Sequence, residues 1–568
     1  MTWRIIQADV MEGLAGLAEG SVHCVVTSPP YWGLRNYGVE PSRWPAVMFA
    51  PAPGLASIQI PEMTCCLGLE PEPWSYIGHL VAVFRDVRRV LRTDGTCWVN
   101  TADCYAKKGM SGLSSKSDRS TLDGGANRAH SSQRKTIPHG LKVKDLVATS
   151  AMLALALEAD GWWWRCPIIW AKPNPMPSSQ TDRPTIAHEY VWMMSKSEKY
   201  FYDATAVEEA ATYVGPNEPD AIKQPSGWDS SPGGHRELTG RYGNGGKNEQ
   251  SGDRQKAGFN ERWAKVKGGR NAFRGQGAER DGANGPANRD GRDMRDVGAG
   301  MTRTKRSVWT IATAPFSGQF CTACHRYYSD GWRGLERHEE NGTAAAICVC
   351  GRWDAWLSHF ASFPTALVEP CILAGTSERG CCPECGAPRR RVVEAGEPDL
   401  EHQIACGGDR NGKYDGQATK DYGSARAQDP SATKVRILEG MRETKTRGWL
   451  PTCACLGQKP EPGLTVLRID KVTDLKRRER IEKQMVRLKS TPLQSCLVLD
   501  PFAGAGTTLL VAERLGRDSV GIEINPEYVR MATERIEADC PLFNGRAEGT
   551  GGRVDRITGL TGLGTGTG

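Results

Sequence analysis

Long hydrophobic runs are missing from this chain. No window approaches the roughly 18 uninterrupted apolar residues that a membrane-spanning helix needs. Met1 leads within a few residues into a strand-like pattern, without the apolar stretch that is typical of a signal peptide. We therefore expect an intracellular, cytoplasmic protein with no membrane partner.

Hydrophobic residues are also few for a chain of this length. They make up 39% of 568 residues, whereas glycine alone occurs 65 times. The length allows two or more domains, but this composition indicates that a good part of the chain does not belong to a packed core. The net charge of +7 is spread over the whole chain and gives only weak support for a nucleic-acid partner.

Two common nucleotide-binding motifs are absent from a region that otherwise favours a nucleotide. Residues 496–500 have a buried-strand pattern, residues 504–506 a glycine turn, and residues 507–515 the pattern of a helix. The turn has neither the G-x-G-x-x-G spacing of dinucleotide sites nor the Lys-Ser/Thr of a P-loop, so NAD and ATP are poorer candidates. A strand over residues 519–524 then brings Glu523 to the place where such α/β units accept hydrogen bonds from ribose hydroxyls.

A second informative segment lies near the start of the chain. Residues 27–32 (Thr-Ser-Pro-Pro-Tyr-Trp) follow a strand pattern at residues 22–26, and the two prolines prevent the sheet from continuing. The Ser28 side chain and the Pro29 carbonyl are then available as acceptors in one pocket, and Tyr31 adds an aromatic face. A strand that ends in a proline turn is the alternative explanation.

This arrangement suits chemistry on an aryl amine. The nitrogen of an aryl amine is a poor nucleophile because its lone pair is delocalised into the ring, and two acceptors on its N–H groups would localise that pair. A base in a duplex reaches such a pocket only when it is flipped out, and stacking on an aromatic side chain returns about 1–3 kcal/mol per base.

These segments resemble a known family. The sequences TSPPYW (27–32), DPFAGAGTT (500–508) and VGIEINPEYVRMATERI (520–536) are similar, in that order, to the catalytic, S-adenosylmethionine-binding and following segments of the β-class DNA amino-methyltransferases. Members of this family modify cytosine N4 or adenine N6. The resemblance covers residues 1–210, 307–318, 359–375 and 496–538.

The resemblance implies roles for the residues that match the family. The catalytic pocket would consist of Ser28, Pro29, Pro30 and Tyr31, and the cofactor site would be lined by Asp9, Asp500, Phe502, Gly504, Gly506, Thr507 and Glu523. Glu523 would contact the ribose and Asp9 the adenine of the cofactor, although Ala8 stands where the family usually has glycine. Residues 363–372 resemble a cofactor-flanking segment, and the start of an ordinary hydrophobic helix explains them nearly as well.

The same resemblance implies a site-specific, S-adenosylmethionine-dependent DNA methyltransferase that acts on a flipped base in double-stranded DNA. Serine at position 28 is typical of cytosine-N4 enzymes and aspartate of adenine-N6 enzymes, so we predict cytosine N4, with adenine N6 as the alternative. An alternative of another class is a non-catalytic zinc-ribbon protein that binds nucleic acid. A homodimer is left open, and so is the choice among a restriction partner, a solitary enzyme and a phage-encoded protective enzyme in a bacterial or phage-infected cell.

Eight of the 19 cysteines fall into two sets of close pairs. The sets are Cys321, Cys324, Cys348 and Cys350, and Cys382, Cys385, Cys453 and Cys455. Four thiolates in two pairs are the ligand pattern of a structural zinc ribbon, and disulfides are disfavoured in a reducing cytosol, so we predict up to two zinc ions. His325 is an alternative ligand, although a surface position is the more common explanation. We predict that Cys24, Cys97, Cys166 and Cys496 are small core residues.

We therefore expect an α/β fold, a circularly permuted S-adenosylmethionine-dependent methyltransferase (Rossmann-like) sheet with inserted zinc ribbons and disordered loops. The expected parts are a catalytic half (1–210), a low-complexity insertion (211–306), a zinc-ribbon-like insertion (307–358), a cofactor-flanking segment (359–380), a second zinc-ribbon-like insertion with a charged linker (381–495), a cofactor-binding half (496–545) and a disordered tail (546–568). The first insertion either recognises DNA or is a flexible linker. Its candidate phosphate contacts are Arg254, Arg262, Arg270, Arg274 and Arg303.

Overall fold

The computed structural model describes most of the predicted methyltransferase segments. The described residues are 3–33, 39–106, 140–175, 180–210, 302–313, 319–328, 335, 337–340, 343–352, 356–357, 363–398, 442–455, 457, 459–539 and 553–556. The chain divides into two compact units, the first made of Met1–Val207, Thr304–Glu394 and Thr446–Gly568, and the second of Glu208–Arg303 and Ala395–Lys445. All sites discussed below lie in the first unit. Of the five candidate phosphate-binding arginines, only Arg303 lies within the described residues.

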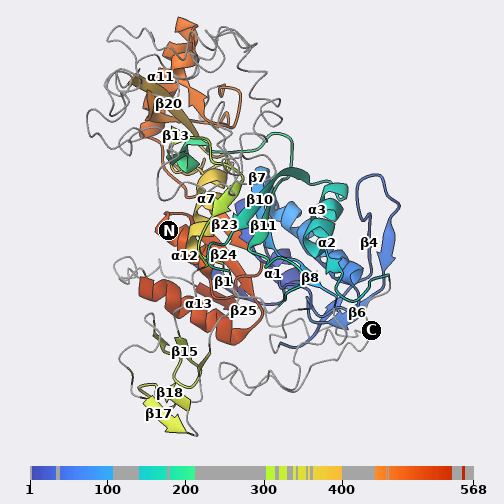
Figure 1. The fold of residues 1–568 in the computed structure, drawn as a ribbon. Coiled ribbons are helices and arrows are strands. Elements are labelled where there is room, and N and C mark those ends of the chain that lie inside the picture. Colours follow the sequence, from blue (N-terminus) through green and yellow to red (C-terminus); the bar gives the residue numbers. More distant parts are fainter. Residues whose placement is uncertain are drawn as a thin grey trace, which may run out of the picture. The chain divides into compact units, whose positions relative to one another are not determined.

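A nine-stranded sheet forms the centre of the first unit (Figure 1). In spatial order its strands are β14 (Val308–Thr310), β10 (Trp163–Ala171), β11 (His188–Ser195), β7 (Leu91–Thr101), β2 (Val22–Thr27), β23 (Leu497–Asp500), β24 (Asp518–Glu523), β1 (Trp3–Gln7) and β25 (Arg553–Arg556). β11 is antiparallel to both of its neighbours, and all other neighbouring pairs are parallel.

Strands from the two ends of the chain interleave in this sheet. β23 and β24, from near the C-terminus, lie between β2 and β1, from near the N-terminus. In the register, Val25 of β2 is paired with Leu499 of β23, and Leu499 is paired with Val520 of β24. The expected permuted α/β sheet is therefore confirmed.

Helices cover both faces of the sheet because the strand side chains alternate between them. On one face, Val25 packs in a core with the helices α1 (Val10–Ala15), α2 (Pro73–Val90) and α3 (Thr149–Ala159). On the other face, Cys24 and Val26 pack with α7 (Thr365–Gly375) and α12 (Thr507–Arg514), and α13 (Pro526–Asp539) continues this layer over β1. Figure 1 shows α2 and α3 on one side of the sheet and α7, α12 and α13 on the other.

The remaining described elements belong to small separate sheets, turns and one further helix. They are β3 (Ser42–Trp44) with β6 (Met63–Cys65), β4 (Val47–Phe49) with β5 (Ile58–Ile60), β8 (Cys104–Tyr105) with β9 (Leu146–Val147), β12 (Glu209–Ala210) with β13 (Thr302–Arg303), β16 (Tyr327–Tyr328) with β15 (Gln319–Cys321) and β19 (Trp356–Leu357), β17 (Arg337–Glu340) with β18 (Thr343–Ala346), and β21 (Arg442–Leu450) with β20 (Arg390–Pro398) and β22 (Leu467–Arg468). Two 3-10 turns, η1 (Thr205–Val207) and η4 (Ile469–Lys471), and the helix α11 (Leu475–Lys489), which lies in the segment expected to contain a charged linker, complete the described structure.

Two local elements differ from what their short sequence patterns indicate. Residues 93–95 (Thr-Asp-Gly) have the composition of a turn, but β7 runs through them, because a register irregularity opposite Val22 and Cys24 accommodates the extra length and Arg92 binds Asp94. The helical pattern that begins near residue 145 becomes a helix only from Thr149, because the preceding residues pair as β9 with β8.

The tail expected to be disordered from residue 546 contributes an edge strand. Residues 553–556 extend the sheet as β25 next to β1, and Arg4 lies 3.5 Å from Asp555. The backbone groups at the free edge of β1 explain this pairing, since an unpaired strand edge accepts another strand. The rest of the tail and the insertion at residues 211–301 lie outside the described residues.

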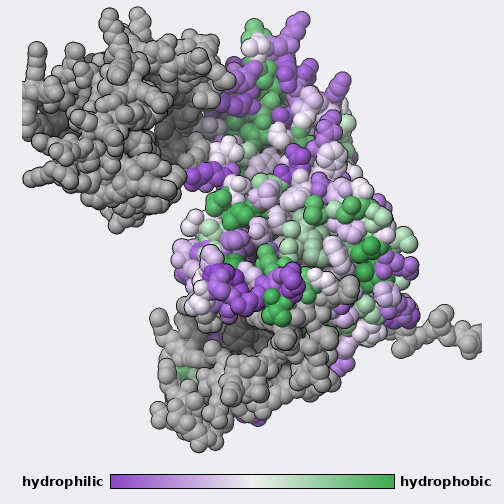
Figure 2. All heavy atoms as spheres, turned by 45° about the vertical axis from the view of Figure 1, so that its right-hand side comes forward, coloured by the Kyte–Doolittle hydropathy of each residue, from purple (hydrophilic) through white to green (hydrophobic). Residues whose placement is uncertain are grey.

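No helix in the described part of the chain is both long and apolar enough to cross a membrane. On the face drawn in Figure 2, hydrophilic and hydrophobic residues are intermixed over the described surface.

Candidate active site

A buried hydrogen bond joins the two motifs that the sequence singled out. Thr27, the last residue of β2, donates from its hydroxyl to Asp500 Oδ1 at 2.7 Å, across 473 positions of sequence. The other carboxylate oxygen of Asp500 accepts from the Thr508 hydroxyl at 2.8 Å, and the side chain is only 1% exposed. The carboxyl ends of β2 and β23 are therefore fixed to each other, with Ser28 and the glycine turn next to this joint.

The Asp500 carboxylate holds this joint and shapes the turn. Besides the two hydroxyls, it accepts from the backbone N–H of Phe502 at 3.1 Å. Burial raises the pKa of Asp500 to about 6, and these hydrogen bonds act against that rise. Because both of its oxygens are engaged within the chain, Asp500 positions the backbone that follows it.

Ser28 and Tyr31 lie together beyond the end of β2. The Ser28 hydroxyl donates to the Tyr31 hydroxyl at 3.3 Å, and Pro30 O accepts from the Tyr76 hydroxyl at 2.9 Å. Among the described residues, none donates a hydrogen bond to the Pro29 carbonyl. The predicted acceptors and the aromatic side chain thus occur within one short segment.

A polar network that the sequence does not reveal holds Tyr31. The Tyr31 hydroxyl lies 2.8 Å from Glu189 Oε2 and 3.0 Å from Asn100 Oδ1, and its single proton can be donated to one of them at a time. Asn100 donates to Glu189 Oε2 at 3.1 Å, and Lys172 forms an ion pair with the other oxygen of Glu189. Burial raises the pKa of Tyr31 well above its ordinary value, and the charge of Glu189 raises it further, so the hydroxyl remains a donor.

These three residues come from neighbouring strands of the sheet. Asn100 lies on β7, Glu189 on β11 and Lys172 directly after β10. The only signal in the sequence was a charged residue at the start of an otherwise apolar strand pattern at residues 188–195. That signal does not say which partners Glu189 meets.

The glycine turn that is predicted to hold a cofactor follows the end of β23. Gly504 and Gly506 have φ values of +52° and +73°, a left-handed conformation that favours glycine. Gly504 N–H donates to Glu523 Oε2 at 2.9 Å, and Asn525 N–H donates to Glu523 Oε1 at 2.8 Å. Each carboxylate oxygen keeps further acceptor capacity, so Glu523 fits the ribose hydroxyls of a nucleoside.

The other predicted cofactor residues lie around this turn or at the neighbouring strand end. Thr507 is buried at the first turn of α12, where its hydroxyl accepts from Arg535 at 2.9 Å. Phe502 is partly buried within the turn region. Asp9 caps α1 by accepting from Met11 N–H at 2.9 Å, and its other oxygen accepts from the Ser42 hydroxyl at 2.5 Å. Most of the segment at residues 363–372 belongs to α7, which packs against the sheet.

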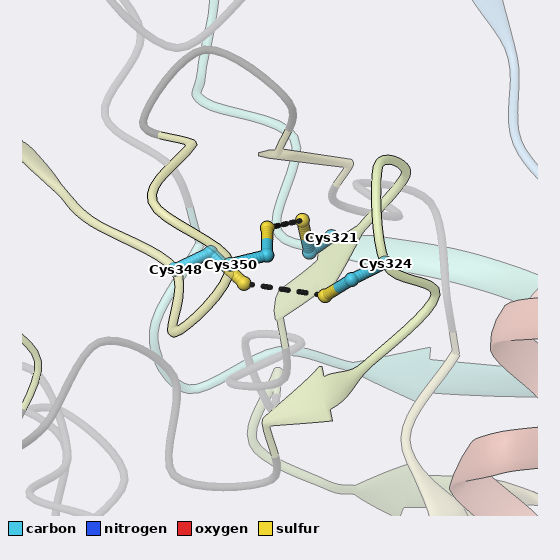
Figure 3. A group of neighbouring side chains, drawn as sticks. All are labelled: Cys321, Cys324, Cys348 and Cys350. Carbon is cyan, nitrogen blue, oxygen red and sulfur yellow. Dashed lines mark hydrogen bonds between the residues drawn. The ribbon is translucent and has the colours of Figure 1, made fainter.

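The first cysteine set comes together as four neighbouring thiols. Figure 3 shows Cys348 and Cys350 facing Cys324 and Cys321, and the sulfur atoms of all four lie within 4.8 Å of one another. Two of these distances are 3.4 Å (Cys324 to Cys348) and 3.7 Å (Cys321 to Cys350). A tetrahedral zinc with bonds of about 2.3 Å separates its ligands by about 3.8 Å, so the geometry fits this metal. His325 lies outside the group, where its ring is 2.9 Å from Arg530.

The second set forms an equivalent group. The sulfur atoms of Cys382, Cys385, Cys453 and Cys455 also lie within 4.8 Å of one another. Gly386 follows the second cysteine with φ +70°, as His325 does in the first set with φ +59°. Both sets therefore have the tight turn that presents two thiols to one ion. Of the predicted core cysteines, Cys24, Cys97 and Cys496 are buried, but Cys166 is only partly buried.

The fold and these site elements define a methyltransferase-type α/β protein. A family model described as DNA methylase matches residues 22–382 and 479–534, and the chain belongs to this DNA methylase family.

Among curated proteins, the chain is 39% identical over 205 residues to the Type II methyltransferase M.Cfr9I of Citrobacter freundii, covering 36% of this chain and 58% of that protein. It is 41% identical over 209 residues to the Type II methyltransferase M.SmaI of Serratia marcescens, covering 37% and 61%. The chain thus spans about three fifths of the length of these relatives. Among solved structures, the chain is similar to the PvuII DNA methyltransferase (cytosine-N4-specific), over 98% of this chain and 95% of that one. The identity is 14% and the TM-score 0.36, and these values are too low to assign any residue a role.

Proposed function

We propose that the protein is an S-adenosylmethionine-dependent DNA methyltransferase that modifies the exocyclic N4 of cytosine in a flipped base. The observation that carries this proposal is the hydrogen bond from Thr27 to Asp500, which joins the residues that precede the Ser-Pro-Pro-Tyr segment and the glycine turn. The family membership and the names of the two relatives, both Type II methyltransferases, support it.

In this proposal the residues of the chain divide the work between base and cofactor. When bound, S-adenosylmethionine would supply an electrophilic methyl group. The amino nitrogen would take this group as the carbon–sulfur bond breaks, S-adenosylhomocysteine would leave, and the amino proton would pass to water. Ser28 Oγ and the Pro29 carbonyl accept from the amino group and draw away its developing positive charge. Tyr31 provides the stacking face, and Glu189, Asn100 and Lys172 fix its orientation. The turn at Gly504 and the Glu523 carboxylate hold the methyl donor.

The target base follows from the residue at position 28. A neutral serine hydroxyl accepts less strongly than a carboxylate, and serine here supports cytosine N4. DNA incubated with the protein and S-adenosylmethionine should yield N4-methylcytosine when its nucleosides are analysed by mass spectrometry. N6-methyladenine without N4-methylcytosine would establish the adenine alternative instead. If neither product is found, the alternative is a nucleic-acid-binding protein without this activity.

Cofactor binding should depend on the ionisation of Glu523. Burial raises the pKa of Glu523 from its ordinary 4.5 to about 7, although the N–H groups of Asn525 and Gly504 act against the rise. Ribose hydroxyls need the ionised carboxylate as acceptor, so affinity for S-adenosylmethionine should fall as pH drops below 7, approaching about tenfold per pH unit. Calorimetric titrations between pH 5.5 and 8 measure this slope. Glu523→Gln should bind weakly with a much flatter profile, and a wild-type profile that is flat would contradict the assigned role.

The contribution of Glu523 to folding stability changes with pH in the opposite direction to cofactor affinity. Because its pKa is higher in the folded state, the protonated form favours folding below pH 4.5. That contribution to the free energy of unfolding is lost as pH rises from about 4.5 to 7. Bound cofactor should reduce this loss of stability, since the cofactor binds the ionised carboxylate of Glu523.

Glu189→Gln tests the network around Tyr31. The amide keeps the size of the side chain but loses the ion pair with Lys172 and weakens the acceptor for the Tyr31 hydroxyl. We expect kcat to fall about 10- to 100-fold, since charged hydrogen bonds contribute about 1.5–3 kcal/mol, while affinity for S-adenosylmethionine stays unchanged. Single-turnover methylation and calorimetry measure the two quantities. A loss of cofactor affinity with unchanged kcat would argue against a positioning role.

We further propose structural zinc at both cysteine sets. Each provides four thiols, which leaves no open position for a catalytic water. Metal analysis of the purified chain should find up to two zinc ions per molecule, and no zinc would remove this proposal without affecting the methyltransferase one.

A further inference from the structure

The turn of the second cysteine set lies against the start of the central strands. His23, near the start of β2, is 2.7 Å through Nε2 from the carbonyl of Gly386, which directly follows Cys385. The other ring nitrogen of His23, Nδ1, accepts from the backbone N–H of Leu497 at 3.0 Å. Since Nδ1 accepts, Nε2 carries the proton and donates to Gly386. One buried imidazole thus connects the cysteine turn to β2 and β23.

A third strand is attached in the same place. Arg92, on β7, donates from Nη1 to the carbonyl of Cys385 at 2.7 Å and is itself held by Asp94 through two hydrogen bonds. The strands β7, β2 and β23 are consecutive neighbours in the sheet. The turn at residues 382–386 therefore contacts β7 through Arg92 and β2 through His23, and His23 extends the connection to β23 through Leu497.

The chain on either side of this turn is also bound to the segment that leads into β23. Cys381 N–H donates to Gln494 O at 2.8 Å, and the buried Arg389 donates to Pro492 O at 3.1 Å. A side chain at Gly380 would place its Cβ 2.2 Å from Gln494 O, so the two backbones are in close contact. This packing leaves little freedom for the cysteine turn to move independently of β23.

His23 also lies within 4.8 Å of the thiols of Cys381 and Cys496. A metal at that point would need a ring nitrogen of His23, but both are used in the hydrogen bonds to Gly386 and Leu497. His23 is therefore a connector between protein segments, and the ligand set that can take an ion is the neighbouring group of four cysteines.

We propose that zinc bound by Cys382, Cys385, Cys453 and Cys455 acts as a clamp on the two halves of the permuted sheet. The metal fixes the carbonyls of Cys385 and Gly386, and through Arg92 and His23 these carbonyls hold β7, β2 and β23 at their amino ends. The opposite ends of β2 and β23 carry Ser28 and Asp500, so the clamp supports the alignment of base pocket and cofactor turn without contacting either. Only its effect on cofactor affinity rests on the proposed function.

The hydrogen-exchange rate of the Leu497 amide reports on the clamp directly, because this N–H is the donor to His23. In the full-length, zinc-loaded protein we expect Cys385→Ser to remove about one zinc, to accelerate exchange at Leu497 by about tenfold or more, and to weaken S-adenosylmethionine binding by about tenfold. His23→Leu should keep both zinc ions and cause the same two changes. Combining the substitutions should add little, since both act through one connection.

Cys350→Ser in the first set is the matched control. It should also remove about one zinc but leave exchange at Leu497 unchanged. Only exchange at Leu497 is compared for this control. Phe320, which precedes Cys321, packs with Ala505 of the glycine turn, so Cys350→Ser could change cofactor affinity by a separate route.

Two results would overturn the clamp: no loss of zinc on Cys385→Ser, or loss of zinc with unchanged exchange at Leu497. If the zinc-loaded wild type fails to bind S-adenosylmethionine, the proposed function is wrong, and the exchange data still decide whether the clamp exists. Arg92→Met, which breaks only the contact with Cys385 O and the pair with Asp94, serves as a second variant if His23→Leu does not fold.

Discussion

Replacing Tyr31 with alanine should lower kcat/KM for DNA methylation by about 100-fold or more. Base–aromatic stacking is worth about 1–3 kcal/mol, and the alanine also leaves Glu189 and Asn100 without the hydroxyl that they contact. Affinity for S-adenosylmethionine should change little, because no cofactor-turn residue contacts this side chain among those described. Methyl transfer to a DNA substrate and calorimetry with the cofactor separate the two effects.

Tyr31→Phe is the matched control for this substitution. It keeps the aromatic face and removes only the hydroxyl, so we expect a loss of about tenfold. Full activity of the alanine variant would falsify the assignment of Tyr31 to the base pocket. Equal losses in both variants would show that the hydroxyl network matters more than the stacking face.

Gly504→Leu should abolish measurable methylation through loss of cofactor binding. At φ +52° a leucine costs about 1–2 kcal/mol of backbone strain, and its side chain adds bulk to the turn that approaches the cofactor. The strain alone should not unfold the protein. We expect affinity for S-adenosylmethionine to fall by more than about 100-fold, an effect of about 2.7 kcal/mol or more, which calorimetry can detect.

Gly20→Leu separates strain from the specific role of Gly504. Gly20 has a similar φ of +62°, lies just before β2, and a Cβ there would meet no atom within 4 Å. It should therefore cost similar stability, measured by thermal unfolding, while cofactor binding and methylation remain. Loss of cofactor affinity in both variants would mean that strain, rather than access to the turn, explains the Gly504 result.

Several elements near the site could be predicted because their signals are local. The strand expected at residues 22–26 is β2, the helix expected at residues 507–515 is α12 to within one residue, and Glu523 ends β24 as anticipated. Short apolar runs indicate buried strands. The glycines at 504 and 506 indicate the turn, since they take conformations that other residues adopt only with strain. The clustering of each cysteine set also followed from paired spacing.

Other features depend on the pairing of distant segments and were missed. The contact between Glu189 and Tyr31 spans 158 positions and requires β11 to lie beside β7 in one register, with Val191 opposite Asn100. The sequence marks Glu189 as a charged residue beside apolar ones but does not give that register. His23 is likewise an unremarkable strand residue until its two partners, 363 and 474 positions away, are brought to it.

The sequence by itself determined the candidates for the chemistry: the residues predicted to accept an amine, the turn predicted to hold a nucleoside and the thiols predicted to share a metal. These are properties of residue types at short spacing. Only the tertiary structure decided how the parts are joined, because strand order and register depend on burial across the whole sheet. It brought Thr27 and Asp500 within 2.7 Å, so that their hydrogen bond joins β2 to β23. It also anchored a cysteine turn on β7 and β2, with His23 connecting that turn to β23.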